Sequence, residues 1–94
     1  MAEITIVQAH ALAPAQARAA AQQVADKIAD EYNLECEWED NVLYFERSGV
    51  QGSLTLEPTQ AEMYIKLGFL MSAFSATIEA KVAENMRKVF SGAR

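Results

Sequence analysis

The sequence has few of the residues that build covalent or metal-bound frameworks. Its 94 residues include one cysteine, Cys36, and one histidine, His10. A lone cysteine excludes a disulfide within the chain and is typical of a reducing compartment. One cysteine and one histidine also cannot supply the three or four nitrogen and sulfur ligands of a zinc site. We therefore predict a cytoplasmic protein with no metal and no cofactor.

Positive charge and long apolar runs are also scarce. Eight lysines and arginines stand against 13 acidic residues, which gives a formal net charge of −5. Nucleic-acid binding depends on clustered Lys and Arg that neutralise phosphates, so the charge balance argues against such a partner. No apolar run approaches the ~20 residues of a transmembrane helix, and the N-terminus lacks the charged-then-apolar pattern of a signal peptide. The chain is therefore expected to have no transmembrane segment.

The composition is that of a globular protein. Apolar residues make up 51% of the chain, and a chain of this length buries roughly 60–65% of its unfolded surface around one core. No linker, repeat or low-complexity tract interrupts the sequence. We therefore expect a single domain over residues 1–94.

The first third of the chain predicts a strand followed by a helix. Residues 3–9 are rich in β-branched side chains that alternate with polar ones, as in a strand. Pro14 fits the first turn of a helix, and Asn33 tolerates the left-handed conformation that ends one. Between them, apolar residues recur at helical spacing: Ala17, Ala21, Val24, Ile28 and Tyr32.

Residues 34–47 carry the clearest hairpin pattern. Apolar residues alternate with glutamates over residues 34–39, so one face is apolar and the other acidic. Asp40 and Asn41 form a two-residue turn, since both residue types tolerate positive φ. This turn sets the register of the two strands, because a slip of one residue would turn the glutamates inward. The predicted pairs are Trp38 with Leu43 and Cys36 with Phe45.

The second half of the chain predicts two more strands and a long helix. Alternation continues over residues 50–56 and 63–67, and Gly52 marks a bulge or the close approach of a helix. A helix then runs from residue 69 or 72 to residue 90. The predicted fold class is α+β: an antiparallel five-stranded sheet in the element order β-α-β-β-β-β-α, packed against two helices.

No set of residues in the sequence has the pattern of a catalytic site. Cys36 falls on the predicted core face beside Trp38 and Phe45, where a thiol is buried and inert. The acidic hairpin face could bind a hard cation or perform acid–base chemistry, but a solvated outer face that discourages edge-to-edge association explains it better. The acidic residues are Glu35, Glu37, Glu39 and Glu46. We predict that the protein is not an enzyme and has neither catalytic nor metal-binding residues.

The stretch around Phe69 is more apolar than one helix face requires. In one interpretation, all its side chains enter the core where the last strand meets the helix. In the other, Phe69 lies opposite the core-facing arc of the helix and joins a row of alanines in an exposed patch. The core-facing arc holds Leu70, Met71, Phe74, Ile78, Val82, Met86 and Val89. The candidate interface consists of Phe69, Leu70, Met71, Ala73, Ala76 and Ala80.

Three segments of the chain resemble the polyhydroxyalkanoic acid (PHA) system protein family. They read ITIVQAH, LECEWEDNVLYFERSGVQGSL and IKLGFLMSAFSATIEAKVAENM. The likeness covers residues 4–90 and is most specific at residues 45–50 and 67–70. The family consists of small bacterial proteins associated with polyester granules, and it has no established activity or catalytic residues. The resemblance therefore implies a role in PHA metabolism or at the granule rather than a particular reaction.

Two functional hypotheses follow. In the first, a non-enzymatic accessory protein associates with the PHA granule surface, or with granule-associated proteins, through the apolar surface around Phe69. The alternative is a binding module for a small hydrophobic ligand. The element order also resembles a reduced helix-grip fold, which implies that an acyl chain could lie between the C-terminal helix and the sheet. The alanine-rich helix face is in addition compatible with a homodimer.

Overall fold

The computed structural model describes residues 2–91, without the side chains of Leu70 and Ser91. It contains five strands, two α-helices and one 3-10 helix, η1, and it confirms the predicted α+β class and element order. The elements are β1 (Ala2–Ala9), α1 (Pro14–Tyr32), β2 (Glu35–Glu39), β3 (Val42–Arg47), β4 (Val50–Leu56), β5 (Gln60–Leu67), η1 (Phe69–Phe74) and α2 (Ser75–Ser91).

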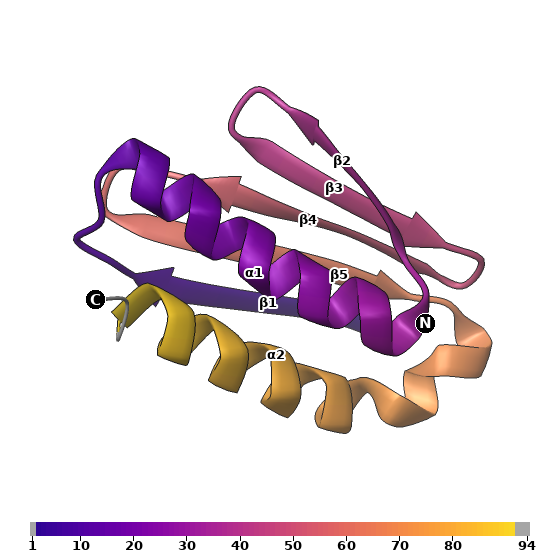
Figure 1. Cartoon of the computed structure of the whole chain (residues 1–94). Coiled ribbons are helices and arrows are strands. Elements are labelled where there is room, and N and C mark those ends of the chain that lie inside the picture. The colour runs from indigo at the N-terminus through magenta and orange to yellow at the C-terminus, as the bar shows by residue number, and fades with distance from the viewer. Residues whose placement is uncertain (1, 92–94) are drawn as a thin grey trace.

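The strands form one antiparallel sheet in the order β1-β5-β4-β3-β2. Strands β2 to β5 follow one another as hairpins, and β1 pairs with the far side of β5. Both helices lie on the same face of the sheet: α2 runs along β1 and α1 lies beside α2 (Figure 1). The molecule therefore has two layers, and the second face of the sheet has no helix over it.

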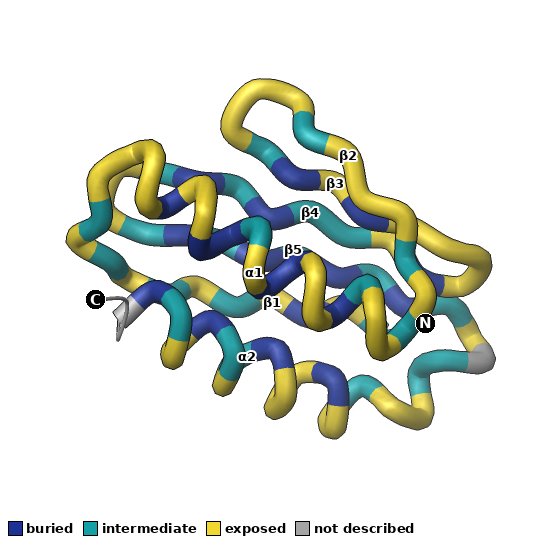
Figure 2. Tube along the Cα trace, viewed as in Figure 1, coloured by how far each residue is buried: buried dark blue, intermediate teal, exposed yellow. Residues whose placement is uncertain are grey.

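The core fills the space between the helices and the sheet (Figure 2). Strand residues on the helix-facing side pair across the sheet, as in the row Leu43, Leu54 and Met63, all of which are buried. Helix α1 contributes mainly small side chains, which allow its backbone to approach the sheet closely. Its buried residues are Ala17, Ala20, Ala21, Val24, Ala25 and Ile28.

The ends of α1 are as predicted. The helix begins at Pro14, and the side chain of Gln16 accepts a hydrogen bond of 3.2 Å from the N–H of Ala13. Asn33 follows the helix with φ 59° and ψ 48°, the left-handed conformation, and its N–H donates to the carbonyl oxygen of Ala29. Residue type alone therefore indicated both boundaries.

The hairpin register is confirmed, but the predicted burial of Cys36 is wrong. Trp38 pairs with Leu43 and Cys36 with Phe45, across a turn in which Asp40 has φ 57°. Cys36 is exposed because β2 is an edge strand lying beyond α1 (Figure 1). The alternation identified the apolar face of the hairpin, but it carried no information on how far the helices extend over that face.

Gly52 serves neither of the two predicted purposes. It lies in regular pairing, opposite Phe45 on one side and Ile65 on the other, so it forms no bulge. No helix requires it either, because the ring of Phe45 occupies the place of a side chain: a Cβ on Gly52 would overlap the ring and lie 2.8 Å from the carbonyl oxygen of Tyr64. Gly52 therefore leaves room, by having no side chain, for the ring of Phe45 on the neighbouring strand.

Candidate functional site

The segment around Phe69 lies at one end of the sheet, where β5 leads into η1 (Figure 1). Two glycines bring this junction against the β3–β4 turn: the N–H of Gly68 donates to the carbonyl oxygen of Gly49 over 2.8 Å. A Cβ on Gly68 would lie 3.4 Å from backbone atoms of Gly49, and Gly49 itself has φ 89°. Both positions therefore favour glycine, one for space and the other for conformation.

The 3-10 turn is tied back to this glycine pair. The carbonyl oxygen of Gly68 accepts hydrogen bonds from the N–H of Met71 (3.1 Å) and the hydroxyl of Ser72 (3.0 Å). Met71 is partly buried and packs against the core, with its Cγ 3.7 Å from where a Cβ on Gly49 would stand. Met71 therefore anchors the turn to the core while staying partly exposed.

Two aromatic side chains of the turn face solvent. Phe69 is 85% exposed and Phe74 is 55% exposed, so the prediction that Phe74 belongs to the core is wrong. That prediction placed residues 69–74 on the same helical wheel as the helix that follows, whereas they form the separate 3-10 helix η1 and α2 begins only at Ser75. Ile78 and the later core residues of α2 are buried.

The predicted alanines Ala73, Ala76 and Ala80 are all exposed, as their position opposite the core-facing arc requires. We call Phe69, Ala73, Phe74 and Ala76 the apolar tip. The side chain of Leu70, the remaining predicted interface residue, lies outside the described part of the structure.

Phe74 is the member of the apolar tip that the sequence did not predict. The serines on either side of residues 73–74 are residue types that favour helix ends, and they were the available signal of a break.

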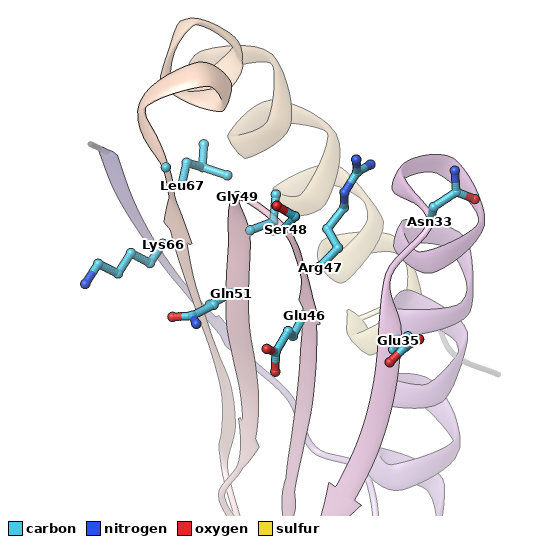
Figure 3. Close-up of a pocket in the computed structure, with 11 residues that line it drawn as sticks. Asn33, Glu35, Glu46, Arg47, Ser48, Gly49, Gln51, Lys66 and Leu67 are labelled. Atoms are coloured by element: carbon cyan, nitrogen blue, oxygen red, sulfur yellow. The ribbon is translucent and has the colours of Figure 1, made fainter.

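A polar hollow of about 740 Å³ adjoins the tip. Lys66, Gln51 and Glu46 extend from adjacent strands on the open face of the sheet, and Ser48 lies at the β3–β4 turn (Figure 3). Arg47 lines it too and donates from Nη1 to the carbonyl oxygen of Tyr32 over 2.7 Å, which joins β3 to the end of α1. Because its lining carries both signs of charge, the hollow has no evident preference for an anion or a cation.

The acidic hairpin residues are exposed and spread along the open face. Glu35 lies directly opposite Glu46, whereas Glu37 faces Tyr44. Within residues 2–91 no group of three or more His, Cys, Asp or Glu is arranged to hold a metal ion. Partial burial, and then the charge of Asp26, raise the pKa of the Cys36 thiol. A raised pKa disfavours the thiolate, so the geometry does not activate Cys36 as a nucleophile.

The comparisons identify the family. The model of the family described as "putative polyhydroxyalkanoic acid system protein" matches residues 4–90, and the chain belongs to this family. No curated protein and no solved structure matches the chain. Neither described helix is long and apolar enough to cross a membrane. Residues 45–50 and 67–70, where the resemblance is most specific, meet beside the tip through the pairing of Val50 with Leu67 and the Gly68–Gly49 hydrogen bond.

Proposed function

We propose that this member of the PHA system family is a non-enzymatic accessory protein that associates with polyester granules through the apolar tip. The observation that carries the proposal is the exposure of Phe69 and Phe74 on the six-residue 3-10 helix η1, at one end of the molecule. A granule presents an extended apolar polymer surface, and burial of aromatic side chains on such a surface is favourable.

The tip differs from the rest of the described surface. Four large hydrophobic side chains are exposed among residues whose burial is described: Val7, Tyr44, Phe69 and Phe74. Val7 and Tyr44 lie on different strands, β1 and β3, which are not neighbours in the sheet. Single exposed apolar residues are common on soluble proteins, whereas Phe69 and Phe74 are two exposed aromatic residues on one short helix. The tip is therefore the stronger candidate.

The tip is also held in a fixed conformation before binding. The carbonyl oxygen of Gly68 fixes the first turn of η1, and Met71 holds the turn to the core. A surface that is already ordered loses little conformational entropy on binding. This supports a direct role in binding for a segment that could otherwise be a passive connection.

The size of the tip sets the expected strength of association. Burying one phenylalanine side chain contributes about 1.5–3 kcal/mol, so Phe69 and Phe74 together supply about 3–5 kcal/mol, given that Phe74 is already partly covered. A single acyl anchor likewise gives only marginal and reversible binding. We therefore expect the protein to exchange on and off granules.

Co-sedimentation with granules stripped of their own proteins tests this proposal. The variant with Phe69→Ser and Phe74→Ser should bind at least about tenfold more weakly than the original chain, because its main apolar contacts are gone. A matched control carries Val7→Ser and Tyr44→Ser, which removes two exposed apolar side chains elsewhere. Equal binding of tip variant and original chain would overturn the proposal, and so would an equal loss in tip and control variants.

The acyl-chain alternative lacks a supporting observation where it was expected. The side chains that α2 turns toward the sheet, including Ile78, Val82 and Met86, are buried in the same cluster as the strand residues Ile4 and Ile65. Side chains thus occupy the space between the C-terminal helix and the sheet. We do not propose a ligand there.

A further inference from the structure

A second hollow, of about 520 Å³, lies at the end of the sheet opposite the apolar tip. It opens between the start of α1, the β2–β3 turn and the β4–β5 turn. Strand β5 begins near this hollow at Gln60 and ends near the tip at Leu67, eight residues that span roughly 25 Å. The hollow is therefore a separate feature from the proposed docking surface.

The walls of the hollow are largely apolar and are fixed in place. Leu12, Leu56 and Pro58 line it. His10 joins two of the walls: its Nδ1 accepts from the N–H of Leu12 over 3.1 Å, and its Nε2 lies 3.0 Å from the carbonyl oxygen of Glu57. Because Nδ1 is an acceptor, the ring carries its proton on Nε2 and donates to Glu57. The cavity is thus preformed, as small-molecule sites usually are.

Arg18 brings a positive charge to this apolar cavity. Its Nη1 donates to the carbonyl oxygen of Asp40 over 3.0 Å, and its guanidinium carbon lies 3.9 Å from the centroid of the Trp38 ring. These two contacts orient the group, yet no carboxylate within residues 2–91 forms an ion pair with it. The guanidinium has further N–H groups in a planar fork that matches a carboxylate. Arg18 therefore lacks the anionic partner that its geometry suits.

Glu57 restricts what the hollow can accept. This carboxylate also belongs to the lining, and its Oε1 accepts from Nε2 of Gln60 over 2.9 Å. A ligand with a second negative group would be repelled by Glu57. The two charged groups thus favour one carboxylate per ligand, bound on the Arg18 side.

We propose that this hollow binds a small monocarboxylic acid with a short apolar chain. The carboxylate pairs with Arg18, and the chain lies along Leu12, Leu56 and Pro58. The proposal is independent of granule association, because its residues are at the other end of the molecule and it can fail or succeed without affecting the tip.

Titration of the isotope-labelled protein with hexanoate, followed by NMR, tests the site. Amide resonances of residues around the hollow should shift and saturate, while those of the tip should not. Hexanol, which has the chain without the charge, and adipate, which has a second carboxylate, should each bind at least about tenfold more weakly. The absence of shifts at about 10 mM hexanoate, or equal binding of hexanol, would overturn the proposal.

Three variants locate the site. Arg18→Gln should weaken hexanoate binding at least about tenfold, whereas Lys66→Gln, which removes one positive charge at the other end of the sheet, should leave it unchanged. Ala15→Phe should abolish binding by filling the hollow, since Ala15 is an exposed lining residue. This variant keeps the test decisive if Arg18→Gln disturbs the β2–β3 turn. Undiminished binding by folded Ala15→Phe would contradict the proposed location.

Discussion

At the residue scale, one glycine determines how the centre of the sheet packs. The Phe45 ring lies over Gly52, on the neighbouring strand, where any other residue would place a side chain. This arrangement lets a large ring pack within the buried core. The alternation in the sequence put Gly52 among the core-facing positions of its strand. It could not show which neighbouring side chain fills the space that a glycine leaves.

Gly52→Ala should lower the free energy of unfolding by about 2–3 kcal/mol, because the new methyl group overlaps the Phe45 ring and cannot be accommodated without displacing it. Ser53→Ala, on the open face of the same strand, should change stability by less than about 0.5 kcal/mol. Urea unfolding of both variants measures the difference. If Gly52→Ala proves as stable as the original chain, the packing of Phe45 over Gly52 is incorrect.

Tyr64 should titrate at a higher pH than a free tyrosine. Partial burial is the largest cause of its raised pKa, and the charge of Glu3 and a hydrogen bond to that carboxylate add to it. The folded state holds this proton more tightly than the unfolded state, so protonated Tyr64 contributes to the free energy of unfolding. This contribution to stability is complete below about pH 10 and is lost as the pH rises through the folded-state pKa.

Glu3→Gln should therefore lower the pKa of Tyr64 toward its ordinary value and weaken the alkaline loss of stability. The ultraviolet absorbance of tyrosinate follows the titration, and Tyr64→Phe identifies which transition belongs to this residue. An unchanged transition in Glu3→Gln would exclude the Glu3 interaction as a cause of the shift.

At the element scale, the β2–β3 hairpin combines a well-defined register with an unfavourable charge pair. Glu35 and Glu46 lie directly opposite each other on the open face, and like charges in that position are destabilising. The alternation that fixes the register also brings the two carboxylates together, because any slip would expose the apolar face. The hairpin thus keeps its register at some cost in electrostatic energy.

Glu35→Lys should stabilise the protein by about 0.5–1 kcal/mol at low ionic strength, since it replaces a repulsive cross-strand pair with an attractive one. The gain should shrink in high salt, because both side chains are exposed. Glu37→Lys is the matched control, as Glu37 faces Tyr44 and not an acid. Urea unfolding at two salt concentrations measures both variants, and an equal gain in both would point to net charge instead of the pair.

The elements differ in how far the sequence determines them. The strands and the hairpin register were predictable because alternation and a two-residue turn are local signals. The exposures of Phe74 and Cys36 were not. The first depends on how η1 sits at the end of the sheet ahead of α2, and the second on how far a helix extends over an edge strand. Both are outcomes of tertiary packing: the serines around residues 73–74 indicate a helix break, but they do not show which side chains it exposes.

At the scale of the whole molecule, the two proposed sites lie at opposite ends of one sheet. The apolar tip was partly anticipated from the sequence, because Phe69 does not fit the core-facing arc of its helix. The hollow at Arg18 was not, because it joins the start of α1 with the β2–β3 and β4–β5 turns, which are distant in the chain. A periodicity argument cannot detect a site made from three separate turns.

The position of η1 at the end of the sheet also sets the orientation of a docked molecule. The structure measures 37 × 24 × 19 Å along its principal axes, and η1 projects beyond the end of β5 at one extremity of the view (Figure 1). A protein that contacts a granule through the apolar tip stands on end and covers an area close to its 24 × 19 Å cross-section. Molecules bound in this orientation occupy less of the granule surface than molecules bound along their long side, so they pack more densely. In each molecule, the face of the sheet without helices and the Arg18 hollow do not contact the polymer.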